Sequence, residues 1–103
     1  MTGGEINMAS ARITCINKSG GYHDNPHEAI SHYGWVDING ATGKSNRADM
    51  VNWIESGNSA YVTDSYGNKV YCMIKTSRNG NKFLQTESDG KPTNNLLELP
   101  ECQ

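Results

Sequence analysis

The sequence lacks any apolar run approaching the roughly 20 residues that a membrane-spanning helix needs. Its N-terminus also lacks a basic region followed by an apolar stretch, the pattern of a secretory signal. We therefore expect a soluble, unexported protein that is found in the cytoplasm and has no membrane partner.

An excess of basic residues is also missing. Nine Lys and Arg stand against eleven Asp and Glu, a formal net charge of −2, so the surface as a whole does not supply the positive field that nonspecific nucleic-acid binding needs. With one Phe and 35% hydrophobic residues, the 103-residue chain can build one modest core. We expect a loose leader over residues 1–10 and a single domain over residues 11–103.

The three cysteines, Cys15, Cys72 and Cys102, are an odd number and have no CxxC spacing. That count argues against the disulfide framework of a small secreted domain and predicts free, buried thiols. The asparagine sequon at residues 17–19 is then a chance match, because glycosylation requires export.

Alternation and turn residues predict strands at residues 12–17, 59–63, 69–76 and 81–86. A helix is predicted over residues 46–56, with Ser45 as N-cap, an apolar side formed by Met50, Trp53 and Ile54, and Gly57 as the stop. Residues 33–38 are either a brief strand or an ordered loop. Asn79-Gly80 predicts a two-residue hairpin turn that would pair Thr76 with Phe83 and Ile74 with Gln85.

Together these elements predict an α+β fold, in which a small antiparallel sheet packs against one main helix. The sheet consists of the N-terminal strand and a three-stranded meander. Residues 94–99 are expected to fold back as a turn or short helix over this sheet. Leu96, Leu97 and Leu99 are therefore core candidates.

The C-terminal region carries a family signature: Phe83-Leu84-Gln85-Thr86, then Asp89-Gly90, then residues 95–100, NLLELP. With Arg12-Ile13-Thr14-Cys15-Ile16 and the helix end at residues 53–57, WIESG, the chain resembles the bacterial and phage domain-of-unknown-function 3892 family over about residues 11–102. The resemblance implies a small stand-alone or appended domain, found also on mobile elements, with no agreed catalytic residues. The loop expected at residues 20–43 departs from it and is richer in His and Gly.

Several motifs resemble catalytic or ligand sites but fail on spacing. The run GATGKS at residues 40–45 lacks the first glycine of a phosphate-binding loop, because that position is Ile38. His23, His27 and His32, with Asp24 and Glu28, do not reproduce a zinc-binding helix. Cys15 and Cys72 are expected in strand interiors, and Cys102 has no neighbouring base in the sequence. A carboxylate pair would need a cleft, for which a domain of this size has little room. We therefore expect no enzyme and no cofactor, with a minor metal-dependent or thiol enzyme as the weakest alternative.

One local basic stripe remains. Lys69, Lys75, Arg78 and Lys82 occur without an intervening acidic residue, and Tyr71 falls on the strand face of Lys69 and Lys75. Such a face can stack and neutralise single-stranded nucleic acid, or it can be a solvated meander whose lysines protect a strand edge. A nucleic-acid-binding module is therefore the chief alternative function.

The favoured hypothesis is a small non-enzymatic binding protein that contacts another protein. Because the family resemblance includes phage proteins, an inhibitor or modulator of a host defence complex is a specific form of it. Rigid aromatic side chains make good contact anchors. The candidate anchors are Tyr22, Tyr33 and Trp35, which are expected to be exposed in the loop over residues 20–43, although core packing is the alternative role for them.

Overall fold

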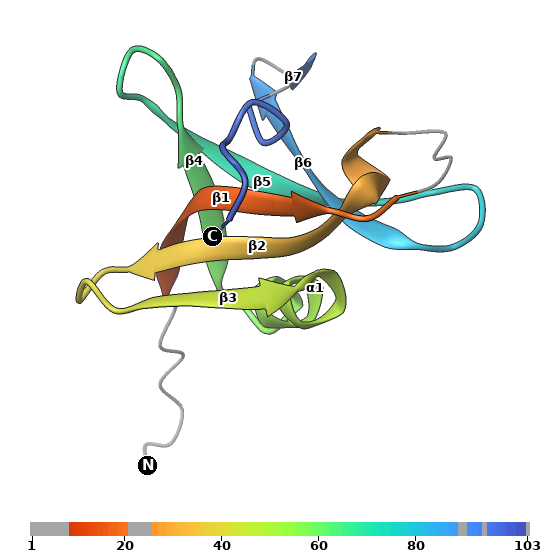
Figure 1. Ribbon diagram of the computed structural model, residues 1–103, viewed down its shortest axis with the longest axis horizontal. Helices are drawn as coiled ribbons and strands as arrows, with labels where there is room; N and C mark the ends of the chain where they lie inside the picture. The colour runs from red at the N-terminus through yellow and green to blue at the C-terminus, as the bar shows by residue number, and fades with distance from the viewer. Residues whose placement is uncertain (1–8, 21–25, 89–90, 94, 103) are drawn as a thin grey trace.

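The computed structural model describes residues 9–20, 26–88, 91–93 and 95–102. Within them, seven strands form one sheet in the order β3-β2-β1-β4-β5-β6-β7 (Figure 1). Neighbouring strands pair antiparallel, except that β1 and β4 are parallel. The strands are β1 (Ser10–Lys18), β2 (Ile30–Asp37), β3 (Thr42–Asn46), β4 (Ser59–Thr63), β5 (Lys69–Thr76), β6 (Lys82–Ser88) and β7 (Lys91–Thr93).

The predicted fold class is wrong. The sheet is large and mixed, and most of the structure belongs to it. The helices are the nine-residue α1 (Arg47–Glu55) and a single turn of 3-10 helix, η1 (Pro26–Ala29). The error lies in the expected loop at residues 20–43, which contains β2 and the start of β3. The β3 sequence TGKSN has no large apolar residue, so it carries no strand signal of its own and depends on pairing with β2.

Elsewhere the predicted elements are confirmed. Strands β4 and β5 have the predicted bounds, and α1 begins and ends one residue inside the predicted helix. The N-cap is Asn46 rather than Ser45, because the Asn46 side chain accepts a hydrogen bond from the Asp49 backbone N–H at 2.8 Å. Ser45 instead lies within β3.

Three hairpins share one turn design. In residues 37–41, 64–68 and 77–81 the first residue donates its backbone N–H to the carbonyl of the fifth, and the fourth is a glycine with φ between 83° and 87°. The side chain of the first residue accepts backbone N–H bonds within the turn. The turn at Asn79-Gly80 is therefore one residue longer than predicted, and Thr76 pairs with Lys82 instead of Phe83.

Strand β1 carries a bulge. The pairing with β2 passes from Ile13↔Trp35 to Cys15↔Gly34, which leaves Thr14 as an extra residue. The bulge shifts the alternation by one, so that Ile13 and Ile16, three residues apart, are both buried. A simple two-residue period along this strand could not have given that result.

The core lies where α1, the sheet and the C-terminal segment meet. Leu96 is fully buried, and Leu97 and Leu99 are partly buried against the core, as predicted. The buried residues of the hydrophobic core are Ile13, Ile16, Ile30, Tyr33, Met50, Val51, Ala60, Val62, Val70, Leu84 and Leu96. Within the described residues, α1 is too short and too polar to cross a membrane, and no other helix meets that requirement.

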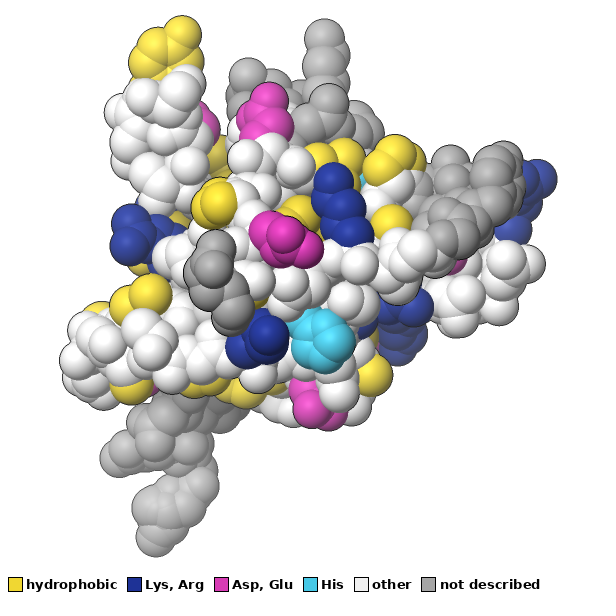
Figure 2. Space-filling model, viewed as in Figure 1, with side chains coloured by type: hydrophobic (Ala, Val, Ile, Leu, Met, Phe, Trp, Pro, Cys, Tyr) yellow, Lys and Arg dark blue, Asp and Glu magenta, His cyan; other side chains and the backbone are white. Residues whose placement is uncertain are grey.

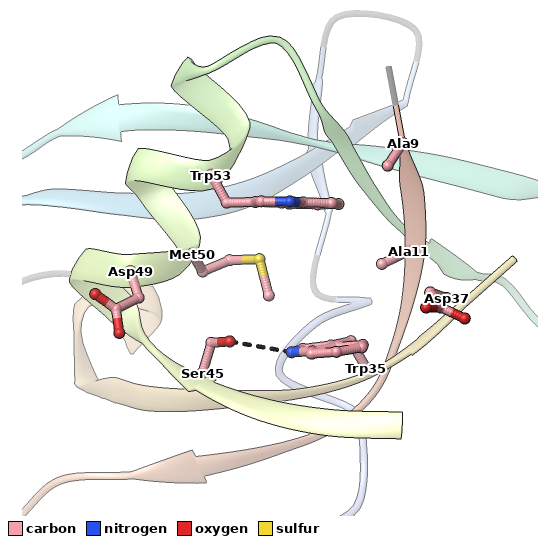
Figure 3. A pocket seen from close by; sticks show the side chains of 8 residues that line it. All are labelled: Ala9, Ala11, Trp35, Asp37, Ser45, Asp49, Met50 and Trp53. Atoms are coloured by element: carbon pink, nitrogen blue, oxygen red, sulfur yellow. Dashed lines mark hydrogen bonds between the residues drawn. The ribbon is translucent and has the colours of Figure 1, made fainter. Parts of the chain in front are cut away.

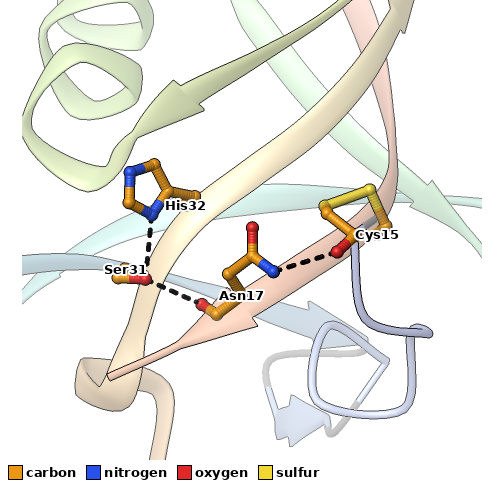
Figure 4. Close-up of a disulfide and its surroundings, with 5 residues drawn as sticks. Cys15, Asn17, Ser31 and His32 are labelled. Atoms are coloured by element: carbon orange, nitrogen blue, oxygen red, sulfur yellow. Dashed lines mark hydrogen bonds between the residues drawn. A yellow bond between two sulfur atoms is a disulfide. The ribbon is translucent and has the colours of Figure 1, made fainter. Parts of the chain in front are cut away.

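The C-terminus returns to β1, and this corrects the prediction of three free thiols. Glu101 forms a parallel bridge with Ile16, and Cys15 and Cys102 form a disulfide across a separation of 87 residues (Figure 4). Gly34 makes room for it, because a Cβ there would collide with both sulfur atoms. Cys72 is the free thiol. The Asn17 side-chain amide donates to the Cys102 carbonyl at 3.2 Å and further fixes the end of the chain.

Candidate functional site

A cavity of about 390 Å³ lies between α1 and the sheet face formed by β1, β2 and β3 (Figure 3). Its lining is mostly apolar, with two indole rings as the largest groups. The described residues that line it are Ala9, Ala11, Trp35, Asp37, Ser45, Asp49, Met50 and Trp53. In size and character the cavity falls within the range of small-ligand and anchor pockets.

The wall on the sheet side is the indole of Trp35. Trp35 pairs with Gly43 across β2 and β3, and a Cβ at Gly43 would collide with three atoms of its ring. The ring therefore lies flat over Gly43. Its Nε1–H donates to the hydroxyl of Ser45 at 3.0 Å, and this hydrogen bond fixes the orientation of the ring against β3. The absence of a side chain at residue 43 is thus what makes this wall.

The wall on the helix side is the indole of Trp53. Asn46 ends β3 and caps α1, which begins at Arg47, so that positions 49, 50 and 53 of the helix border the cavity. Figure 3 shows the rings of Trp53 and Trp35 facing one another across the space, with the side chain of Met50 reaching between them. Met50 is 2% exposed and closes the inner end of the cavity, while both tryptophans are only partly buried.

Asp37 and Asp49 lie on opposite sides of the cavity, and the Asp49 carboxylate is directed away from the two indoles (Figure 3). One Asp37 oxygen, Oδ1, accepts the backbone N–H bonds of Asn39 and Ala41 in the β2–β3 turn, at 2.8 and 2.9 Å. Asp49 is exposed on α1, and its carboxylate has no ion pair or hydrogen bond to any described residue. The described residues of the lining include no Lys, Arg or His, so the charge of the cavity is negative.

The three predicted contact anchors differ in where they lie. Trp35 lines the cavity. Tyr33 is on β2 and is 0% exposed, so the expectation that it is an exposed loop residue is wrong, and the alternative role of core packing holds for it. Burial raises the pKa of its hydroxyl. Tyr22 lies outside the described residues.

Two of the four basic residues in the predicted stripe, Lys75 and Lys82, are paired with acidic groups. Lys75 contacts Glu87 at 2.7 Å, and Lys82 contacts Glu55 on α1 at 2.6 Å. Tyr71 is 48% exposed and packs against Tyr61, with the ring centroids 5.7 Å apart. Lys69 lies over the Tyr61 ring at 4.8 Å.

Arg78, the remaining member of the stripe, is exposed in the β5–β6 turn. On the face shown in Figure 2, the Lys and Arg side chains are spread among polar and acidic groups and do not form a continuous patch. Acidic neighbours therefore balance the charges of Lys75 and Lys82 in the meander.

The histidines do not gather into a metal site in the described part of the chain, where no three His, Cys, Asp or Glu side chains come together. His27 is buried in η1, and burial lowers its pKa. His32 Nδ1 and the Ser31 hydroxyl form a hydrogen bond of 2.9 Å. His23 and Asp24 lie outside the described residues.

The free thiol is not placed for nucleophilic chemistry. Burial raises the pKa of Cys72 to about 12, so the thiol stays protonated at neutral pH. Its partly buried side chain packs against the core. Cys72 therefore acts as a small apolar residue of β5.

The sequence analysis identified Trp35, one wall of the cavity, as a candidate contact residue, but it did not identify Trp53, the other wall. Trp53 was placed on the apolar side of a helix, where core packing is the usual role, and Asp37 and Asp49 carried no motif. The signal that could have joined them is Gly43: a glycine in a strand often marks the close approach of another group, here the Trp35 ring.

Comparison with known proteins identifies the family. The profile of the family described as protein of unknown function (DUF3892) matches residues 12–100. The chain belongs to this family. No curated protein and no solved structure matches the chain.

Proposed function

We propose that this protein is a small, non-enzymatic binding protein that holds a segment of another protein in the cavity between Trp35 and Trp53. The observation that carries the proposal is the pair of facing indoles around a space of about 390 Å³. Partly buried tryptophans are the residues on which binding energy concentrates in protein interfaces. Both rings also pack against the core, and each keeps a side that borders the cavity.

The way in which the walls are built supports a binding role. Trp35 is fixed by Gly43 beneath its ring and by Ser45 at its Nε1–H, so little side-chain freedom remains to be lost on binding. Trp53 is held on a capped helix. A preformed site of this kind binds more tightly, because its side chains are already ordered in the folded protein and lose little conformational entropy on binding.

The proposal assigns no reaction to the cavity. The Ser45 hydroxyl already accepts the indole N–H of Trp35, and Asp37 Oδ1 is occupied by two backbone N–H groups. These groups hold the walls in place. The cytoplasmic location and the specific form of a phage inhibitor of a defence complex stay predictions.

The test is capture of partners from a cell lysate by the intact protein and by Trp35→Ala and Trp53→Ala variants. Tyr66→Ala is the matched control, because Tyr66 is 88% exposed in the β4–β5 turn. We expect one stoichiometric protein partner that both tryptophan variants lose and the Tyr66 variant retains. Equal capture by all of these variants would contradict the proposal.

The same experiment decides the alternative. Recovery that disappears with nuclease and weakens steeply with salt would indicate a nucleic-acid-binding module. The ion pairs of Lys75 and Lys82 with acidic neighbours disfavour that outcome, because paired lysines have less charge to offer to phosphates.

A further inference from the structure

We infer that the group entering the cavity is the guanidinium of an arginine side chain on the partner protein. This inference rests on the proposed function and deepens it, because it names the chemistry that the site recognises. It follows from the ring faces, the charge of the lining and the limited polarity of the walls.

The indoles offer the ligand their faces. The Nε1–H of Trp35 is already donated to Ser45, so the polar edge of this ring is occupied. Trp35 and Trp53 turn their ring faces toward the space between them (Figure 3). The face of an indole is the most favourable of the aromatic surfaces for a cation. A flat group between two faces contacts both at once, and guanidinium is the flat cation among the side chains.

The charge of the lining selects a cation. Asp37 and Asp49 lie on opposite sides of the cavity, and the described lining residues include no base to neutralise them. Lys44, although it lies between Gly43 and Ser45, belongs to the opposite face of β3, because successive strand residues point to opposite sides. Because Asp37 Oδ1 already accepts two backbone N–H groups of the turn, Asp37 Oδ2 and the Asp49 carboxylate are the acceptors that a cation would use.

The apolar walls select arginine over lysine. An ammonium group is compact and strongly hydrated, so it loses much hydration energy between two indoles and Met50. Guanidinium is weakly hydrated on its faces and carries its N–H donors around its edge. Stacked between the rings, it would direct those donors toward the two sides of the cavity, where Asp37 and Asp49 lie.

The experiment uses the fact that the chain has two tryptophans and that both line this cavity. Their two indole N–H signals in a nitrogen–proton NMR spectrum therefore report on the site alone. The probe is N-acetyl-arginine amide, titrated into the intact protein. The matched probes are the citrulline derivative, which has the same shape without the charge, and the lysine derivative.

We expect the arginine probe to shift both indole signals along a saturable curve. The citrulline probe should have little effect, and the lysine probe should bind more weakly than the arginine probe. Asp37→Asn combined with Asp49→Asn should weaken arginine binding about tenfold, because charge-assisted hydrogen bonds are lost. Asn keeps the turn acceptor at residue 37. Glu98→Gln, at an exposed site outside the cavity, should leave the affinity unchanged.

An equal response to the arginine and citrulline probes, or no response to either, would overturn the inference. Failure of the proposed function looks different. If the captured partner depends on Trp35 and Trp53 but excess arginine probe does not displace it, the cavity binds a protein and the guanidinium assignment is wrong. If the arginine probe binds but the intact protein captures no protein partner, the cation site stands and the proposed function is wrong.

Discussion

At the scale of single residues, Gly43 decides the geometry of the cavity. A Cβ at this position would collide with the Trp35 ring, whereas one at Gly20 meets nothing within 4 Å. We expect Gly43→Ala to displace the indole, to shift the tryptophan emission and to lower the free energy of unfolding by about 1–3 kcal/mol, as overpacking does. Gly20→Ala is the control.

Fluorescence spectra and denaturant unfolding of the two variants provide the measurement. If Gly43→Ala and Gly20→Ala gave the same emission and the same unfolding midpoint, the close approach of the ring to the backbone of β3 would be contradicted.

Two buried acids make the fold sensitive to alkali. Burial raises the pKa of Cys72 from 9.0 to about 12, and burial also raises the pKa of Tyr33. The folded protein holds both protons more tightly than the unfolded chain does. The contribution of these two groups to the free energy of unfolding should therefore be constant below about pH 9 and fall as the pH rises from there toward 12.

Thermal unfolding measured across this range tests the prediction. Cys72→Ala and Tyr33→Phe each remove one of the two groups, so each variant should show a shallower fall with pH than the parent protein. A slope unchanged in both variants would show that other groups cause the alkaline loss.

At the scale of secondary-structure elements, the shared turn design determines strand pairing. In the β4–β5 turn, Asp64 Oδ1 accepts the backbone N–H groups of Tyr66 and Asn68, both at 2.9 Å. Asp64→Ala removes both bonds and should lower the free energy of unfolding by about 1–2 kcal/mol. Asp64→Asn keeps the acceptor oxygen and should remain close to the parent protein. Urea unfolding of both variants measures the difference, and equal loss in both would point to the negative charge instead.

The sequence predicted the elements whose signals are local. Strands β4 and β5 and helix α1 have the periodicity and caps that define such elements, and they were found nearly to the residue. Strand β3 was missed because its five residues have no alternating apolar pattern and are stabilised by pairing with β2. Pairing between strands is a long-range property, and a single sequence does not display it.

The candidate site divides in the same way. Trp35 could be picked out as an aromatic residue outside the clear core pattern. Its partner, Trp53, lies 18 positions away on another element and carries the signal of a core residue. The two meet because β3 turns directly into α1, and that geometry depends on the missed strand. Tyr33 was offered as an exposed anchor or a core residue, and it is a core residue of β2.

At the scale of the whole molecule, the disulfide joins the first strand to the end of the chain. Cys15 and Cys102 enclose nearly the entire domain, with a separation of 87 residues. Closing a loop of this length restricts the unfolded chain and is worth about 4 kcal/mol in the chain-entropy description. We expect reduction, or Cys15→Ser with Cys102→Ser, to lower the free energy of unfolding by that order.

Denaturant unfolding with and without a reductant measures this contribution. The double serine variant is the control for the reductant, because its unfolding midpoint should be the same with and without it. An unfolding midpoint of the parent protein that did not change on reduction would contradict the stabilising role of the bond.

We propose that this protein meets its partner at the cavity between Trp35 and Trp53. Photo-cross-linking in living cells tests this, with a benzophenone amino acid placed either at residue 9, in the lining of the cavity, or at residue 66, in the exposed β4–β5 turn. We expect one dominant protein adduct from position 9, abolished by Trp53→Ala, and no such adduct from position 66. An adduct from position 66 alone, or one from position 9 that survives Trp53→Ala, would contradict the proposal.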